Sequence, residues 1–185
     1  MTDTKQRILD VALDLFIERG YDAVSLREIA EQVGVTKAAL YYHFSSKDEI
    51  FRALAAPMQE ITDLLVTGFA GPATPEAWAK SYEEVVDWIL PRRRLLELLQ
   101  NNRQMLQELR PDLEDEERHE ALHERLDAAL SDEGLSLDDR VRMAGSIGLL
   151  MSVLAFPSEA AFSRVSQEQL RASLLAAIRD LLRVG

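Results

Sequence analysis

Helix start and stop signals recur along the whole chain, and they constrain its fold more than any other feature. The segments 25–28 and 166–169 read Ser-Leu-Arg-Glu and Ser-Gln-Glu-Gln. This is the spacing of a capping box, in which two side chains pair with backbone groups at the start of a helix. Gly20 and Gly34 each follow a stretch with helical spacing of apolar residues, as expected where a helix ends. No segment shows the alternation of a half-buried strand, so we expect an all-α protein.

Between these signals the sequence predicts about nine helices. They span approximately residues 4–19, 26–33, 37–43, 46–69, 75–90, 92–109, 112–131, 136–156 and 166–183. Pro57 lies inside the fourth of these helices. A proline there removes a backbone hydrogen bond, so we expect a kink.

Composition excludes several classes of protein. The chain has 185 residues, of which 47% are hydrophobic and none is cysteine, so a packed core is expected but disulfides, thiolate zinc sites and thiol catalysis are not. Its uncharged stretches are too short to span a bilayer, and the first residues lack the apolar core of a signal peptide. We therefore expect a cytoplasmic protein with no membrane partner.

The charge of the chain restricts how it can bind nucleic acid. The net charge is −11, so general attraction to a polyanion is not expected and any such contact must be local. Residues 32–47 contain no Asp or Glu, but they include Lys37 and Lys47. This segment is the place where a local contact is most favourable.

The strongest functional signal is the pair of short predicted helices 26–33 and 37–43. Ala30 is small enough for two helices to cross closely, Gly34 can adopt positive φ, and Leu40 can anchor the second helix. This spacing favours a helix-turn-helix over a plain three-helix subdomain with surface aromatics. The second helix would then expose side chains that suit groove edges and phosphates. They are Thr36, Lys37, Ala38, Tyr41, Tyr42 and His43.

Residues 8–51 resemble the DNA-binding domain of the TetR family of bacterial regulators (TetR/AcrR type). The resemblance rests on Phe16, Gly20, Tyr21, Ile29, Ala30, the segments 33–35 and 40–44, and Lys47. It covers about a quarter of the chain; the remainder matches only in length and helix order. The resemblance implies a three-helix helix-turn-helix domain in residues 1–46 and a helical ligand-binding and dimerisation domain in residues 47–185.

The resemblance also implies a function and a set of DNA contacts. Positions that commonly reach bases are matched by Lys37, Ala38 and Tyr41, and positions that usually hold phosphates by Ser25, Thr36, Tyr42, His43 and Lys47. The implied protein is a repressor that binds a palindromic operator as a homodimer and is released by a small molecule. A ligand-independent DNA-binding protein is the alternative.

The last two predicted helices are apolar over too much of their circumference for one core to cover. We expect the second covering surface to be another copy of the chain, in the four-helix interface that the resemblance implies; a larger monomeric core is the alternative. The expected interface residues are Val141, Gly145, Gly148, Ser152, Leu170, Leu174, Ile178 and Leu181.

A small-molecule pocket is expected among the helices after residue 47. Trp78 and Tyr82 share one apolar helix face, and Asn102 interrupts a stripe of leucines. A buried amide needs a hydrogen-bond partner, which either another helix or a ligand can provide. The expected lining residues are Trp78, Tyr82, Asn102, Met105, His119, His123, Met143 and Met151.

Residues 119–123 read HEALH, the HExxH pattern of zinc proteases. The extended motif would place its further glycine and histidine where Leu126 and Ala129 stand, and the flanking residues are highly charged. A metal-dependent hydrolase is therefore the less favoured alternative. We expect neither enzymatic activity nor a metal or cofactor.

Overall fold

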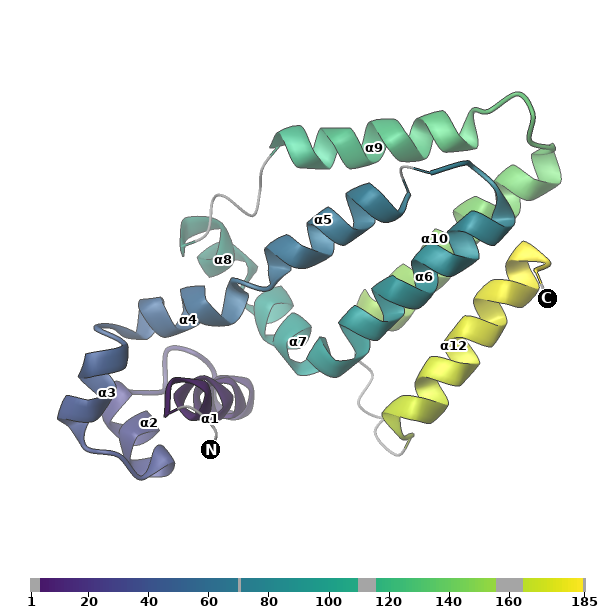
Figure 1. The fold of residues 1–185 in the computed structure, drawn as a ribbon. Coiled ribbons are helices and arrows are strands. Elements are labelled where there is room, and N and C mark those ends of the chain that lie inside the picture. The colour runs from purple at the N-terminus through teal and green to yellow at the C-terminus, as the bar shows by residue number, and fades with distance from the viewer. Residues whose placement is uncertain (1–3, 70, 110–115, 156–164, 185) are drawn as a thin grey trace. The chain divides into compact units, whose positions relative to one another are not determined.

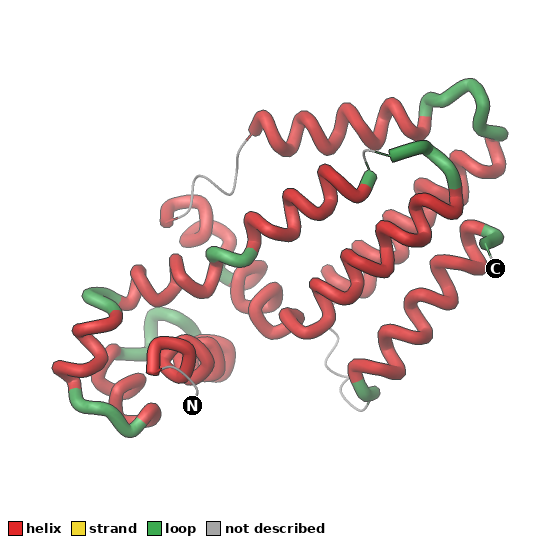
Figure 2. The backbone as a smooth tube through the Cα atoms, viewed as in Figure 1, coloured by secondary structure: helices red, strands yellow, loops and turns green. Residues whose placement is uncertain are grey.

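The computed structural model describes residues 4–69, 71–109, 116–155 and 165–184, and the side chains of 116–119 and 153–155 also lie outside the description. Within these ranges the chain consists of helices and connecting loops, with no strand (Figure 2). The all-α class predicted from the sequence is confirmed. None of the described helices is both long and apolar enough to cross a membrane.

The chain folds into two compact units. The first takes in the described residues of Met1–Met58 and Arg94–Glu114, and the second those of Gln59–Arg93 and Asp115–Gly185. The predicted division at residue 46 concerns function rather than compactness, and it stays a prediction.

The described residues of the first unit form six helices, and three of these begin at a capping hydroxyl group (Figure 1). They are α1 (Thr4–Arg19), α2 (Leu26–Val33), α3 (Lys37–His43), α4 (Lys47–Ala55), α7 (Arg93–Asn101) and α8 (Arg103–Leu109). The hydroxyl groups of Ser25, Thr36 and Ser46 cap the starts of α2, α3 and α4. Each hydroxyl accepts a backbone N–H that would otherwise be unpaired in the first helical turn.

The core of the first unit forms around one face of α1. Ile8, Ala12 and Phe16 of this face are almost fully buried. They cluster with apolar residues of the next three helices and of α7. The other members include Tyr21, Val24, Ile29, Ala30, Val33, Leu40, Phe44, Ile50, Phe51, Leu54, Leu95, Leu98 and Leu99. The leucines of α7 thus complete a core that otherwise comes from the first 55 residues, an addition that the sequence did not predict.

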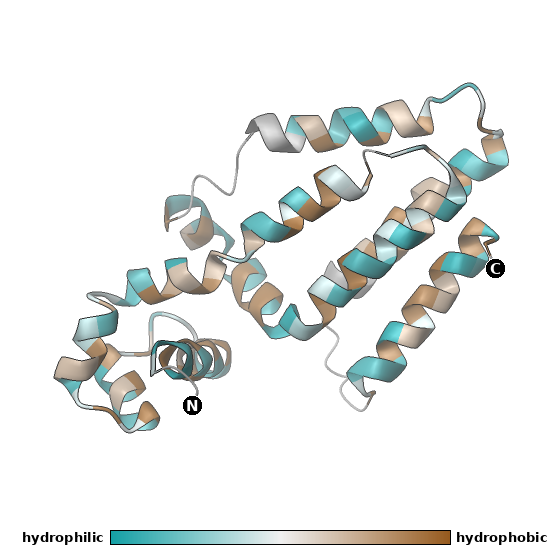
Figure 3. Cartoon of the chain, in the orientation of Figure 1, coloured by the Kyte–Doolittle hydropathy of each residue, from teal (hydrophilic) through white to brown (hydrophobic). Residues whose placement is uncertain are grey.

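The second unit is built on α6 (Pro75–Ile89), α10 (Leu137–Ala155) and α12 (Gln167–Leu182). Helix α12 packs against both α6 and α10, and apolar residues recur along α6 and α12 between polar ones (Figure 3). Two ion pairs, Arg171 with Asp87 and Arg179 with Glu83, also join α6 to α12. The other elements that the structure describes in this unit are α5 (Met58–Gly68), the 3₁₀ turn η1 (Leu90–Arg92) and α9 (Glu116–Leu130).

All nine predicted helices have counterparts in the described structure, but two of them are each split in two. The helix predicted over 46–69 breaks into α4 and α5 at Ala56 and Pro57, which confirms the expected effect of the proline. The helix predicted over 92–109 breaks into α7 and α8 at Asn102. There the Asn102 side-chain amide donates to the Leu98 carbonyl oxygen at 2.8 Å, so the amide finds its partner in its own helix.

Replacing Pro57 by alanine should join α4 and α5 into one helix, because alanine restores the N–H that pairs with the Ala53 carbonyl. We expect the free energy of unfolding to rise by about 1–2 kcal/mol and the amides around the break to exchange more slowly with solvent. Pro75→Ala is the matched control, since Pro75 opens α6, where no helical bond is lost. An unchanged exchange rate in Pro57→Ala would mean that packing, not the proline, imposes the break.

Candidate nucleic-acid interface

Helix α3 presents one face to solvent and fixes the other in the core. Leu40 is fully buried, whereas Tyr41 is 44% exposed and Tyr42 85% exposed. Lys37 and Ala38 are exposed as well, and the Lys37 ammonium lies 5.5 Å from the centre of the Tyr41 ring. A large aromatic side chain that its own fold leaves uncovered is available to a partner.

The turn between α2 and α3 holds α3 in place. Gly34 adopts a left-handed conformation with φ 77° and ψ 34°, which only glycine enters at little cost. Its N–H and that of Val35 both donate to the Ala30 carbonyl at 3.0 Å. The Arg7 guanidinium of α1 adds a hydrogen bond to the Val33 carbonyl at 2.6 Å. The helix-turn-helix that the spacing predicted is therefore present.

The ends of α3 carry two further predicted contact residues. The Thr36 hydroxyl accepts the Ala39 N–H at 3.1 Å, and this bond starts the helix. His43 is half-buried, and its ring meets the edge of the Tyr42 ring with 5.2 Å between centres. Phe44, next in the chain, is buried and closes α3 through a 2.9 Å bond to the Leu40 carbonyl.

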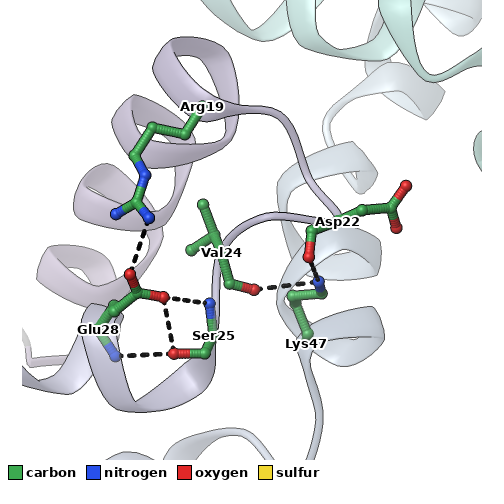
Figure 4. A network of polar contacts seen from close by, with 6 residues as sticks. All are labelled: Arg19, Asp22, Val24, Ser25, Glu28 and Lys47. Atoms are coloured by element: carbon green, nitrogen blue, oxygen red, sulfur yellow. Dashed lines mark hydrogen bonds and ion pairs between the residues drawn. The ribbon is translucent and has the colours of Figure 1, made fainter.

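Ser25 is exposed at the start of α2, but its hydroxyl is occupied by the capping box (Figure 4). Its Oγ accepts the Glu28 N–H at 3.3 Å and donates to Glu28 Oε2 at 2.8 Å, and the Ser25 N–H donates to the same oxygen. Arg19 binds the other carboxylate oxygen at 2.9 Å. The hydrogen bonds from Ser25, with the Arg19 guanidinium next, lower the pKa of Glu28 to about 2.

Lys47 points into the loop before α2 rather than outward (Figure 4). Its ammonium donates to the carbonyl oxygens of Tyr21, Asp22 and Val24 at 2.7, 3.4 and 3.0 Å. It also lies 4.1 Å from the centre of the Tyr21 ring. The Tyr21 hydroxyl in turn donates to the Asp48 carboxylate. Burial raises the pKa of the Tyr21 phenol, and the hydrogen bond to Asp48 is the second largest cause of this increase.

The second unit contains part of the predicted pocket set. Trp78 and Tyr82 are buried and pack edge-on against Phe69, with ring centres 5.0 and 5.3 Å apart. The Tyr82 and Ser146 hydroxyl groups lie 2.8 Å apart, and Ser146 donates to the carbonyl of the buried Met143 at 2.6 Å. Burial raises the pKa of Tyr82 to about 12. The lone serine within an apolar stripe was the available signal for Ser146, and the sequence analysis missed it.

The other predicted pocket residues lie elsewhere. Asn102 and Met105 belong to the first compact unit. Met151 is 46% exposed and His123 is exposed, so neither contributes to the interior of the second unit. The side chain of His119 lies outside the described residues. In the described part of the chain, no three His, Asp or Glu side chains are placed to hold a metal ion together.

The predicted dimer residues divide between two environments. Val141, Gly145, Gly148 and Ser152 are exposed along α10. Three residues predicted on α12 are instead covered by their own protomer: Leu170, Leu174 and Ile178 are 5%, 4% and 0% exposed. Leu181 is half-buried beside α10, where a Cβ added at Gly145 would lie 3.4 Å from its Cδ2 atom.

The depressed pKa of Glu28 makes the stability of the first unit depend on pH. Because the pKa is lower in the folded chain than in the unfolded one, the ionised carboxylate stabilises the fold above about pH 4.5 and this stabilisation is lost as the pH falls toward 2. Glu28→Gln keeps a capping acceptor without the charge, so its thermal midpoint should lie below that of wild type at pH 6 and approach it near pH 2.5. Ser25→Ala removes the side-chain hydrogen bond, the largest cause of the low pKa, and keeps the backbone one, so it should also narrow this pH dependence. A difference between wild type and Glu28→Gln that is the same at both pH values would contradict the assignment.

Comparison with known proteins agrees with this geometry. A model of the bacterial regulatory proteins of the tetR family matches residues 8–54. The HTH-type transcriptional regulator SrpR of Pseudomonas putida is 40% identical over 62 residues, which are 34% of this chain but only 29% of SrpR. The chain thus spans less than a third of the length of this relative.

Solved structures resemble the chain over nearly its whole length. AmtR of Mycobacterium smegmatis is 27% identical with a TM-score of 0.66, covering 100% of this chain and 88% of AmtR. AibR, solved with isovaleryl coenzyme A and operator DNA, is 20% identical with a TM-score of 0.57, covering 95% of this chain and 98% of AibR. Residues 8–54 therefore match the DNA-binding region of the bacterial regulatory proteins of the tetR family, and the chain as a whole has a fold like that of AmtR.

Proposed function

We propose that the protein regulates transcription by binding operator DNA as a homodimer and that a small molecule releases it. The observation that carries the DNA-binding part is the exposed face of α3. This face holds a cation and two phenol rings, and residues 32–47 contain no carboxylate. An acidic chain can approach a polyanion only through such a local surface.

The contacts that we propose follow from the side chains on α3. Lys37, Ala38 and Tyr41 share one exposed face; in the major groove a cation, a phenol and a methyl group can each contact base edges. Thr36, Tyr42 and His43 lie around this face and supply hydroxyl and imidazole groups for phosphates. Ser25 at the start of α2 remains a proposed phosphate neighbour through the positive end of the helix dipole.

The exposed faces of α10 and α12 support the proposed homodimer. Leu137 and Val141 of α10 are 77% and 61% exposed. Gly145, Gly148 and Ser152 continue the stripe along the same helix. On α12 the exposed small residues are Ala172, Ser173, Ala176 and Ala177. We propose that these residues form the α12 side of the interface, in place of Leu170 and Leu174, which are buried within the protomer. Such small side chains allow helices of two protomers to approach closely, and a dimer binds two half-sites about 34 Å apart.

A buried donor supports the proposed effector site. Among the described residues the indole N–H of Trp78 is buried without a hydrogen-bond partner, which costs about 1–3 kcal/mol. A molecule with a hydrogen-bond acceptor would remove that cost. Regulation requires the effector to favour the released state about 10²-fold, or ~2.7 kcal/mol. AibR, a protein of this fold, has been solved with both an acyl coenzyme A and operator DNA.

Neighbouring tyrosines of α3 provide the test of DNA binding. After an operator is selected from a pool of random duplexes, Tyr41→Ala should lower the ratio of operator to random affinity about tenfold, the size of one base contact. Tyr42→Ala should weaken binding to both DNAs by a similar factor, since a phosphate contact carries no sequence information. The measurement is fluorescence anisotropy with both duplexes at one salt concentration. If the two substitutions have equal effects, Tyr41 does not make the base contact that we propose. If the wild-type protein binds neither DNA, the proposed DNA-binding function is refuted.

Gly148 provides the test of the dimer. A Cβ at this position would meet no side chain of its own protomer within 4 Å, and leucine favours helix over glycine. Gly148→Leu should therefore leave the monomer folded but overpack the contact with a second copy, at a cost of about 1–3 kcal/mol. Sedimentation velocity should show a shift toward monomer. Ala128→Leu on the exposed side of α9 is the matched control and should sediment as wild type; an unchanged dimer in Gly148→Leu would place the interface elsewhere.

A further inference from the structure

We propose that Lys47 is a positioning residue, which holds the loop before α2 in place for DNA binding and does not itself bind a phosphate. The inference rests on the proposed DNA-binding function. It departs from the expectation, drawn from the sequence alone, that Lys47 is one of the phosphate contacts.

The hydrogen bonds of Lys47 carry the inference. A lysine ammonium has three protons and no acceptor, and three carbonyl oxygens of the 21–24 loop lie within 3.4 Å of Nζ. The Tyr21 ring covers a further side at 4.1 Å. Each proton therefore already has an acceptor, and a phosphate could be bound only after some of these bonds were broken.

The loop that Lys47 holds leads directly into the DNA-binding helices. Val24 is buried in the core, and Ser25, the cap of α2, follows it in the chain. Asp48 binds the Tyr21 hydroxyl of the same loop. The first turn of α4 thus binds the loop at both of its ends. These contacts fix the position at which α2 begins and, through the Gly34 turn, the position of α3.

Arginine distinguishes a positioning role from a phosphate contact. A guanidinium binds phosphate at least as well as an ammonium does. Its planar, spread donors, however, do not match three carbonyl oxygens that converge on one nitrogen atom. Substitution by arginine should therefore preserve a phosphate contact but disrupt this loop.

The experiment compares Lys47→Arg and Lys47→Met with wild type and with the matched pair Lys37→Arg and Lys37→Met on the exposed face of α3. Affinity for a 30-base-pair duplex is measured over a range of sodium chloride concentrations, at a temperature where circular dichroism shows each variant to be folded. Hydrogen exchange of the amides of residues 22–28 is measured without DNA.

We expect both Lys47 variants to weaken DNA binding about tenfold, to keep the wild-type slope of log affinity against log salt, and to exchange the loop amides faster. Lys37→Met removes a cation from the face that we place against DNA, whichever DNA group that cation contacts. It should instead lower that slope by up to about 0.9, the value for one phosphate charge neutralised, with loop exchange unchanged, and Lys37→Arg should retain the slope. The inference is overturned if Lys47→Arg binds as wild type while Lys47→Met loses slope, or if loop exchange is unchanged in both Lys47 variants. If wild type binds no duplex, the proposed function fails, while the exchange data still decide whether Lys47 anchors the loop.

Discussion

The burial of one face of α1 is the contact on which the rest of the N-terminal unit depends. Helices α2 and α3 have only eight and seven residues, and helices of this length are not stable alone in water. They persist because Ile29 and Leu40 join Ile8 and Phe16 in one core. The exposed side chains of α3 are held in position by residues that never reach the surface.

Polar contacts then refine what the core has placed. The capping box at Ser25, the left-handed Gly34 and the ammonium of Lys47 each satisfy backbone groups at a point where the chain changes direction. None of these contacts buries a large apolar surface, but each restricts the conformations that the loops between helices can adopt. A surface that binds a rigid duplex needs this definition, because an error of about 1 Å at the surface misaligns hydrogen bonds to bases.

The sequence predicted the helices and the helix-turn-helix because their signals are local. Caps, glycines and the break at Pro57 act within one or two turns, so residues 25–28 or 34 can be interpreted without knowledge of the rest of the chain. The environment of Lys47 could not be predicted in this way, since its acceptors lie 23 to 26 positions earlier. The same reason explains Leu170 and Ile178: apolar periodicity shows that a face is covered, but not by which chain.

The leucines of α7 bear on whether the helix-turn-helix can be separated from the rest of the chain. Residues 95–99 complete the core of the N-terminal unit, although α5 and α6 of the other unit stand between them and α4 in the chain. A fragment that ends at Met58 would lack these leucines, so the core residues that they cover would be exposed to water. The helix-turn-helix is thus continuous in sequence, but its core is not complete without α7. To graft it onto another protein would require the first 58 residues together with a helix that replaces α7.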